Sequence, residues 1–397
     1  MKKILIICTK YPLAENSTWL TRELAEELNN RGYDIDVICI DWTKNSSKQY
    51  LKLNNISIYN VPSIEISKSG FLNFIVKWGL SSVYAAFYSH KLVTKKHDLV
   101  IGFSPCASSW FLILLGKIFS KKSLLIYWDF FPIHQVQINL IRGKVKEKVL
   151  KVFERYLVNL FNYIGCMSAA NCAFAEKYFG ISANKTFELP IWSEDLILET
   201  SLNLDKSEFP FLDDESIYFI FGGQIDYGRG VECILDAARL AHKSNNKVKT
   251  IIIGRGRFVD KVIAESKNTD SGIIYSDFIP RNSYLNLVSF CRAGIIATVP
   301  NVSVPTYPSK SLDYMKLSLP IIASIEDTTD FGDIIKNAEA GLCCTAGAPG
   351  ELAASMLQLA DNRELAGLMG KNANAFFKAT HEVKKVVNNL LDHINEA

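Results

Sequence analysis

The sequence lacks the cysteine spacing of a structural metal site or of a redox pair. None of its nine cysteines belongs to a Cys-x-x-Cys motif, so neither a zinc ribbon nor a thioredoxin-type site is predicted. Cys8, Cys39 and Cys166 lie inside apolar runs, which is typical of buried thiols in a reducing compartment. We expect no bound metal ion.

Long apolar stretches are also missing. The two longest, residues 70–89 and 107–128, are interrupted by lysines, whereas a membrane span needs about 20 consecutive apolar residues. Residues 1–8 combine two lysines with a short apolar run that no small-residue cleavage site follows. They predict a buried first strand rather than a secretory signal. We therefore expect a cytoplasmic protein that touches a membrane at most from its surface.

Charge is divided unevenly along the chain. Residues 1–197 contain 24 Lys and Arg against 16 Asp and Glu, and the remainder contains 20 against 25. Only the basic first half is therefore expected to face an anionic partner, which could be a membrane surface, a lipid phosphate or a nucleic acid. The tryptophans of this half do not alternate regularly with basic residues, which argues against base stacking and nucleic-acid binding.

Short apolar runs alternate with longer amphipathic segments along the whole chain. This alternation predicts parallel sheets covered by helices on both faces, and 397 residues suffice for two such domains. The pattern restarts after a charged, turn-rich segment at residues 193–214. We expect α/β architecture with doubly wound domains at residues 1–197 and 198–378, which bind ligands at the carboxyl ends of their strands. Residues 379–397 are expected to form a helix that closes the second domain or packs back on the first.

The predicted elements follow from this periodicity. Strands are predicted at residues 3–8, 35–41, 99–102, 124–128, 163–167, 217–222, 249–253, 272–276, 294–297, 320–324 and 341–344. Helices are predicted at residues 17–31, 231–244 and 284–291, and helical spacing recurs over residues 372–394.

Residues 307–315, Tyr-Pro-Ser-Lys-Ser-Leu-Asp-Tyr-Met, carry the most informative pattern in the chain. A proline-bounded turn presents Lys310 at the start of a predicted helix, where free backbone N–H groups attract phosphate. The carboxylate of Asp313 can accept hydrogen bonds from ribose hydroxyls. Pro-Ser-Lys turns also occur as ordinary helix starts. The interpretation of this turn as a phosphate and ribose site therefore depends on the strand–helix pattern around it.

Two glycine turns, at residues 222–230 and 254–256, follow predicted strands of the second half. Glycines allow a backbone to approach phosphate closely, and the guanidinium of Arg229 matches phosphate oxygens, although a plain turn with a solvated arginine remains the alternative. The second turn, at residues 254–256, lacks the third glycine of a dinucleotide motif. Residues 276–281 supply an edge loop whose backbone could read a base.

The succession Gly-Gly-x-x-x-x-Gly-Arg-Gly, Gly-x-Gly, Phe-Ile-Pro-Arg and Pro-Ser-Lys-x-x-Asp-Tyr-Met resembles glycosyltransferase family 4. The first half agrees through Tyr-Pro-Leu at 11–13, Tyr-Trp-Asp-Phe-Phe-Pro at 127–132 and Leu-Pro-Ile-Trp at 189–192. The resemblance covers nearly the whole chain. It implies the GT-B fold, two Rossmann-like domains facing a deep cleft. It also implies a UDP- or GDP-linked sugar donor, retention of anomeric configuration, and no cofactor or obligatory metal.

The resemblance also implies roles for individual residues. Arg229 takes the position of a basic residue that contacts the donor diphosphate, Lys310 lies in the loop near the phosphates and base, and Asp313 replaces a ribose-binding glutamate. Asp129 lies on the acceptor side, where it could accept the proton of the acceptor hydroxyl, orient that hydroxyl, or merely cap a helix. The catalytic candidates are Asp129, Arg229 and Lys310, and the substrate-binding candidates are Gly223, Gln224, Arg229, Gly254, Phe278, Ile279, Tyr307, Pro308, Ser309, Lys310 and Asp313.

The chain departs from the family's pattern at several positions. Gln224 stands where many members have arginine, and Pro305 stands where the first acid of a paired-glutamate pattern is expected. Contacts to the donor sugar are therefore expected from backbone groups at residues 303–307. Residues 15–17 replace the family's first glycine-rich loop. These departures fit the divergent polysaccharide-assembly branch and leave room for an altered donor.

Residues 139–160 interleave six basic residues with apolar ones. An amphipathic helix of this kind suits an anionic membrane surface, and the alternative is a core helix with a solvated basic face. With the basic first half, the segment favours peripheral membrane contact and a lipid-linked oligosaccharide acceptor.

We therefore expect a hexosyl- or N-acetylhexosaminyltransferase of bacterial O-antigen, capsule or exopolysaccharide synthesis. A nucleotide-sugar epimerase of similar shape is the alternative enzyme, although no internal acid–base set is recognisable. A non-enzymatic protein that binds nucleotides or nucleic acid is the third possibility.

Overall fold

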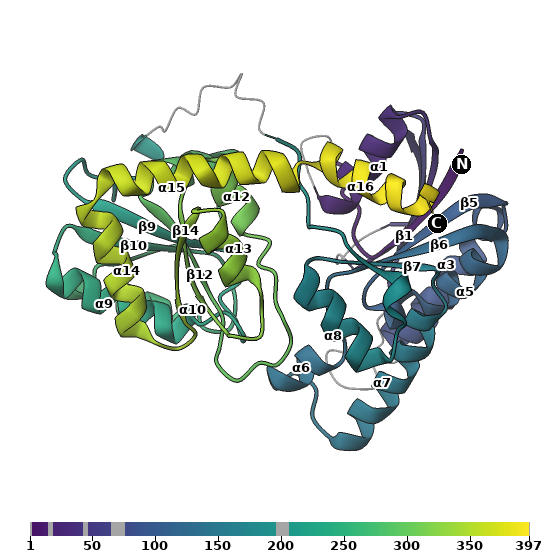
Figure 1. The fold of residues 1–397 in the computed structure, drawn as a ribbon, viewed down its shortest axis with the longest axis horizontal. Coiled ribbons are helices and arrows are strands. Elements are labelled where there is room, and N and C mark those ends of the chain that lie inside the picture. Colours follow the sequence, from purple (N-terminus) through teal and green to yellow (C-terminus); the bar gives the residue numbers. More distant parts are fainter. Residues whose placement is uncertain (1, 15–18, 43–46, 65–75, 196–205, 397) are drawn as a thin grey trace. The chain divides into compact units, whose positions relative to one another are not determined.

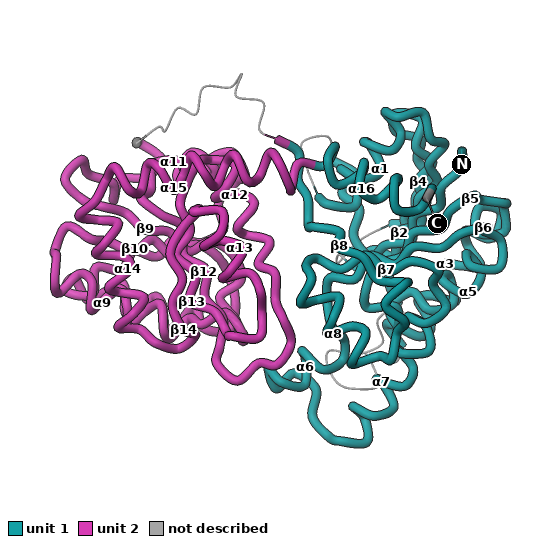
Figure 2. Tube along the Cα trace, in the orientation of Figure 1, with its two compact units in different colours: residues 1–194, 383–397 teal, residues 195–382 magenta. Residues whose placement is uncertain are grey.

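The computed structural model describes residues 2–14, 19–42, 47–64, 76–195 and 206–396. The chain forms two compact units, shown in Figure 2: residues 1–194 with 383–397, and residues 195–382. Each unit is built around one sheet (Figure 1). The sequence-based boundaries, at residues 197 and 378, lie a few residues from these, and the final helix belongs to the first unit.

The first unit contains an eight-stranded sheet of order β3-β4-β2-β1-β5-β6-β7-β8, parallel except for the β3–β4 pair. Its strands are β1 (Lys3–Cys8), β2 (Asp34–Asp41), β3 (Gln49–Leu53), β4 (Ile56–Pro62), β5 (His97–Phe103), β6 (Ser120–Tyr127), β7 (Tyr163–Cys166) and β8 (Thr186–Glu188). Alternate residues of β1 enter opposite apolar layers, Ile4 and Ile6 on one face and Leu5 and Ile7 on the other. A strand that is buried on both faces is apolar throughout, which explains why β1 was predictable.

Helices cover both faces of this sheet. They are α1 (Leu20–Asn30), η1 (Val76–Leu80), α3 (Ser81–Tyr88), α4 (His90–Val93), η2 (Cys106–Ser109), α5 (Trp110–Phe119), α6 (Ile133–Gln137), α7 (Lys144–Asn159), α8 (Ala169–Phe179), η3 (Ala183–Lys185) and α16 (Val383–Glu396). Helices α1 and α16 pack on the layer that contains Ile4, and α3 and α5 pack on the layer that contains Leu5. Over the described part of the chain, no helix combines the length and apolarity that a bilayer crossing requires.

The second unit contains a six-stranded parallel sheet of order β11-β10-β9-β12-β13-β14. Its strands are β9 (Ile217–Gly222), β10 (Val248–Ile253), β11 (Ile273–Ser276), β12 (Ala293–Ala297), β13 (Ile321–Ile325) and β14 (Gly341–Thr345). Its helices are η4 (Lys206–Glu208), α9 (Val231–Ser244), α10 (Val259–Ser266), η5 (Thr269–Ser271), α11 (Arg281–Phe290), α12 (Ser311–Lys316), α13 (Phe331–Asn337), α14 (Pro349–Asp361), α15 (Arg363–Phe376) and η6 (Phe377–His381).

The strand order of the second sheet reverses between β9 and β12. Successive strands are added on one side of β9 up to β11, and on the other side from β12 onward. At such a switch point the loops after the two central strands diverge and leave room for a ligand. The loops after β9 and β12 carry residues 223–230 and 298–310, which include most of the predicted site.

Helical spacing over residues 372–394 predicted continuous helix, but the structure is interrupted there. Helix α15 passes into the π-helical turn η6, and Glu382 is extended, with φ −61° and ψ 130°. The chain then enters α16 in the first unit, where the Val383 N–H donates to the Ser193 carbonyl at 3.1 Å. The interruption coincides with the passage of the chain from one unit to the other.

Candidate functional site

The turn after β9 depends on its two glycines because bulky side chains occupy the adjacent space. A Cβ atom added to Gly222 would lie 2.3 Å from the Tyr284 hydroxyl oxygen. Gly223 has a φ of +125°, and a Cβ atom there would lie 2.6 Å from Cε of Lys310. The absence of a side chain at Gly223 therefore lets Lys310 lie directly against this first glycine turn.

The turn after β10 packs backbone to backbone against the first. Gly254 has a φ of +140°, and a Cβ atom added to it would lie 1.8 Å from the Gly223 carbonyl oxygen. The Gly223 N–H donates to the Ile253 carbonyl at 2.8 Å. The two predicted glycine turns thus form one surface at the carboxyl ends of adjacent strands.

Lys310 and Arg229 bring positive charge to this surface. The Lys310 ammonium lies 3.6 Å from the centroid of the Phe221 ring. Burial, and then the charge of Arg229, lower the pKa of Lys310 well below its ordinary value. Among the described residues, no carboxylate forms an ion pair with either side chain. Two neighbouring cations without a counter-ion suit an anionic ligand that carries more than one charge.

Asp313 is already engaged by basic side chains. Nη1 of Arg281 lies 2.6 Å from Oδ2 of Asp313, Nη2 of Arg281 bonds the other oxygen, and Lys316 Nζ lies 3.6 Å from Oδ1. Burial alone would raise the pKa of Asp313, but the hydrogen bonds and charge of Arg281, with Lys316, bring it below its ordinary value. Asp313 is therefore ionised, and the second lone pair of each oxygen is suited to a hydroxyl donor.

The loop after β11 presents an exposed aromatic ring beside a guanidinium group. Phe278 is 69% exposed, and the Arg255 guanidinium lies 5.6 Å from its ring centroid. Asp277 holds Arg255 through bonds of 2.6 and 3.1 Å and accepts the Phe278 N–H at 2.6 Å. A planar base could stack on this pair, whereas a base contact to the Phe278 N–H would have to replace the bond to Asp277. Ile279, the next residue, is half-buried.

The remaining predicted residues have different surroundings. Tyr307 is buried, and its hydroxyl lies 2.8 Å from Nε2 of His381, so its side chain anchors the loop inside the unit. Gln224 and Ser309 are exposed and Pro308 is half-buried. Residues 15–17, which replace the family's first glycine-rich loop, lie outside the described residues.

Asp129 belongs to the first unit, is exposed, and is the second residue after β6. The Ser104 hydroxyl accepts the N–H groups of both Trp128 and Asp129 at 2.8 Å, which fixes the strand end. The next helix, α6, has Pro132 rather than Asp129 at its N-cap. The interpretation of Asp129 as the cap of α6 is therefore wrong.

Helix α7 accounts for most of residues 139–160, and much of its apolar side faces solvent. Val145, Val149, Val152 and Tyr156 are 77%, 62%, 60% and 58% exposed. The alternative of a core helix with only its basic face solvated is therefore wrong for these positions. Glu154, on the other side of the helix, is fully buried and accepts the N–H groups of residues 106 and 107 at 2.7 and 2.8 Å.

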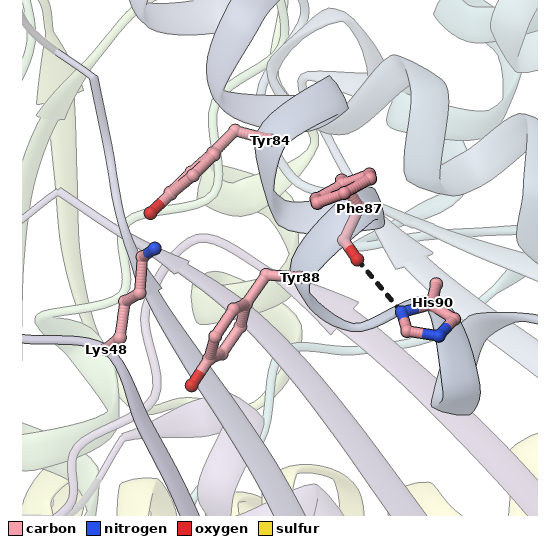
Figure 3. Close-up of a pocket in the computed structure, with 5 residues that line it drawn as sticks. All are labelled: Lys48, Tyr84, Phe87, Tyr88 and His90. Atoms are coloured by element: carbon pink, nitrogen blue, oxygen red, sulfur yellow. Dashed lines mark hydrogen bonds between the residues drawn. The ribbon is translucent and has the colours of Figure 1, made fainter.

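A groove of about 720 Å³ lies elsewhere in the first unit and is shown in Figure 3. It is lined by Lys48, Tyr84, Phe87, Tyr88 and His90. None of these is a predicted site residue, and the groove is separate from the glycine turns, which belong to the second unit.

Sequence reasoning missed three residues that contact the predicted site. Arg281 lies in the Phe-Ile-Pro-Arg motif but was not linked to Asp313, because 32 residues separate the two. His381 is 74 residues from Tyr307. Glu326 bonds the hydroxyl of Thr306 across 20 residues. None of these contacts follows a local spacing that a single sequence would reveal.

Part of the second unit is similar in sequence to a known protein family. Residues 205–376, less than half of the chain, match the family model of glycosyl transferases group 1. No curated protein matches the sequence.

Solved structures match along the whole chain. Sucrose-phosphate synthase from Thermosynechococcus elongatus has a TM-score of 0.75 at 13% identity, over 100% of this chain and 99% of that one. HepE from Anabaena, solved with UDP-glucose, has a TM-score of 0.69 at 12% identity over 100% of both chains. WaaG, a glycosyltransferase involved in lipopolysaccharide biosynthesis, has a TM-score of 0.67 at 12% identity, over 99% of this chain and 100% of that one. Similarities at such identities are similarities of fold.

The family match and the fold together support a glycosyltransferase. The chain has the GT-B fold with two Rossmann-like α/β domains, and residues 205–376 of its second unit match glycosyl transferases group 1.

Proposed function

We propose that the protein is a retaining glycosyltransferase of family 4 type that uses a UDP- or GDP-linked sugar. The observation that carries this proposal is the juxtaposition of Lys310 and Arg229, without a carboxylate partner among the described residues, beside the two glycine turns. A diphosphate supplies the charge that this surface lacks. The UDP-glucose bound to HepE, which has the same fold, supports a nucleotide-sugar donor.

The proposed chemistry is mainly electrostatic. As the bond between the sugar C1 and the diphosphate breaks, negative charge grows on the leaving group, and Lys310 and Arg229 would stabilise it. Asp313 would hold the ribose hydroxyls while Arg281 keeps its carboxylate in place. The acceptor oxygen would bond to C1 on the face that the diphosphate leaves. The hydroxyl proton would pass to Asp129 or, if Asp129 only orients the hydroxyl, to the departing phosphate oxygen. No step requires a protein nucleophile.

Donor hydrolysis tests this proposal without knowledge of the acceptor. The wild-type protein is incubated with a panel of UDP- and GDP-linked hexoses and N-acetylhexosamines, and release of UDP or GDP is measured. We expect one or a few donors to be hydrolysed, and Arg229→Ala and Lys310→Met to lower kcat/KM by at least about tenfold, since each removes a charge-assisted contact. Lys243→Ala, on the exposed side of α9, is the matched control and should have no effect.

Two results would contradict the donor assignment. One is the absence of hydrolysis across the panel, and the other is hydrolysis that neither substitution reduces. Retention is tested separately by NMR, because the released sugar should initially have the anomeric configuration of the donor. Initial release of the opposite anomer would exclude a retaining mechanism.

We further infer that the acceptor is a lipid-linked oligosaccharide and that α7 contacts an anionic membrane surface. The support is the combination of exposed Val145, Val149 and Val152 with six basic residues over residues 139–160. Exposed apolar side chains flanked by basic ones favour the boundary between lipid headgroups and acyl chains. This arrangement fits a transferase of O-antigen, capsule or exopolysaccharide synthesis.

Vesicle sedimentation tests the membrane contact. Lys148→Glu with Lys151→Glu should reduce binding to vesicles that contain anionic lipid, and Val145→Ser with Val149→Ser should do the same without a change of charge. Lys243→Glu with Lys247→Glu, in the second unit, makes the same charge change as the first pair and should bind normally. Equal binding by all variants would leave α7 as a solvated helix.

A further inference from the structure

The loop that carries Lys310 is held by side chains from the segment that follows β13. Residues 298–310 contain neither helix nor strand. The Thr328 hydroxyl donates to the Val302 carbonyl at 2.9 Å, and the Thr329 hydroxyl donates to the Thr306 carbonyl at 2.6 Å. Because a loop of this length has little intrinsic order, its conformation depends on such contacts.

Glu326 holds this loop at two points. It is the first residue after β13 and is only 6% exposed. Its Oε1 accepts the Thr306 hydroxyl at 2.8 Å, and its Oε2 accepts the Thr298 hydroxyl. Thr298 is the first residue of the loop, and Thr306 lies four residues before Lys310. One carboxylate therefore connects the start of the loop to the part that carries the lysine.

A buried carboxylate is an unusual choice for this connection. Within the described ranges no basic side chain forms an ion pair with Glu326, so the two hydroxyl groups are its hydrogen-bond partners there. Burying an unpaired charge is costly, whereas hydrogen bonds to a charged acceptor are shorter and stronger than neutral ones. Glu326 is thus suited to hold two hydroxyl groups in fixed positions, at some cost in stability.

We propose that Glu326 is a positioning residue of the donor site. Through Thr306 it fixes the loop that leads to Lys310, and so sets the place of the lysine ammonium for the donor diphosphate. This inference depends on the proposed function, because it requires that a nucleoside diphosphate binds at Lys310. It assigns Glu326 no contact with the substrate.

The glutamine variant separates the hydrogen bonds from the charge. In Glu326→Gln the carboxamide keeps an acceptor and gains a donor, and a threonine hydroxyl can bond to either. In Glu326→Ala both bonds are lost. UDP and GDP are titrated into each variant by calorimetry, and the nucleotide that the wild type binds is then followed. We expect Glu326→Ala to weaken binding about tenfold, the equivalent of one charged hydrogen bond, and Glu326→Gln to remain within about twofold of wild type.

Two further variants make the test specific. Asp327→Ala removes the neighbouring exposed acid and should bind as wild type. Thr306→Val removes one of the two bonds while Glu326 remains, and should weaken binding in the same direction. It tests the inference even if Glu326→Ala does not fold.

A double-mutant cycle then asks whether Glu326 acts through Lys310. If it does, Glu326→Ala should have little further effect in the Lys310→Ala background. Full additivity of the two effects would overturn the inference, as would equal losses in Glu326→Gln and Glu326→Ala. If Lys310→Ala weakens binding and Glu326→Ala does not, this inference fails while the proposed function stands. If the wild type binds neither UDP nor GDP, the proposed function fails first.

Discussion

The guanidinium group of Arg281 spans both carboxylate oxygens of Asp313, with Nη1 2.6 Å from Oδ2. The two residues come from different helices of the second unit, α11 and α12. A bidentate pair of this kind fixes the plane of the carboxylate as well as its position. The carboxylate of Asp313 is therefore oriented before a ligand binds. A ligand hydroxyl could donate to it while the ion pair with Arg281 stays in place.

We expect Asp313→Ala to weaken UDP binding by about 1.5–3 kcal/mol, because the hydroxyl bonds to a charged acceptor are lost. The same substitution should have little effect on 2′,3′-dideoxy-UDP, which lacks both ribose hydroxyls. Calorimetry with the two ligands checks this difference. An equal loss for both would mean that Asp313 does not contact the ribose. If GDP proves to be the nucleotide bound, GDP and its dideoxy form replace them.

Binding of a diphosphate should be accompanied by proton uptake and should weaken as pH rises. Burial and the charge of Arg229 lower the pKa of Lys310 in the free protein, and a bound dianion would raise it again. Affinity is then greatest below the lowered pKa, where the lysine is already charged, and falls above it. Titrations in buffers of different ionisation enthalpy measure the uptake, which should disappear in Lys310→Met. Persistent uptake in that variant would assign the proton to another group.

The contact between the glycine turns should tolerate no side chain at Gly254. We expect Gly254→Ala to destabilise the protein by at least about 1–3 kcal/mol, because its φ of +140° is unfavourable for alanine and the methyl group would meet the Gly223 carbonyl. Gly350→Ala, where no atom lies within 4 Å of the added Cβ, should be neutral or slightly stabilising. Urea unfolding compares the two. Equal stability would mean that the turns separate easily.

Glu154 should make the protein less stable as pH rises, which is the opposite of what a carboxyl with a lowered pKa does. Burial raises the pKa of its carboxyl from 4.5 to about 7, although backbone N–H groups favour the charged form. The unfolded chain then releases this proton near its ordinary pKa, whereas the folded protein retains it until about pH 7. This residue's contribution to the free energy of unfolding should therefore fall as pH rises between these two values and stay constant above them.

Glu154→Gln should remove this dependence. The difference in free energy of unfolding between wild type and variant, from urea titrations at about pH 5 and pH 8, should shift against the wild type at the higher pH. Glu147→Gln, on the same helix, is the control and should run parallel to wild type. A constant difference for Glu154→Gln would mean that the buried carboxyl keeps an ordinary pKa.

The central parallel strands, such as β1, β9 and β12, were predictable because they are buried on both faces and thus apolar nearly throughout. The short edge strand β8, which is parallel but only partly buried, was not predicted. The hairpin of β3 and β4 was not predicted, although its turn had a recognisable signal. Asn54 and Asn55 separate the two strands and have positive φ values of 46° and 67°, as a two-residue hairpin turn requires. Edge strands with exposed residues such as those of β3 lack the continuous apolar run that identified the others.

The candidate site was predictable only where a motif is local. Glycines and a lysine that end or follow strands indicate a phosphate site from spacing alone, and the structure brings Gly223, Gly254 and Lys310 together. The residues that hold this site come from distant segments: Arg281 for Asp313, His381 for Tyr307 and Glu326 for Thr306. The fold of the second unit brings such pairs together, and sequence periodicity does not specify which distant residues will meet.

A structure with UDP or GDP bound tests the central claim most directly. We expect diphosphate oxygens within hydrogen-bonding distance of the Lys310 ammonium and the Arg229 guanidinium, with a ribose hydroxyl on Asp313. A nucleotide bound elsewhere, or bound here with Lys310 still packed on Phe221 and no phosphate contact, would contradict it.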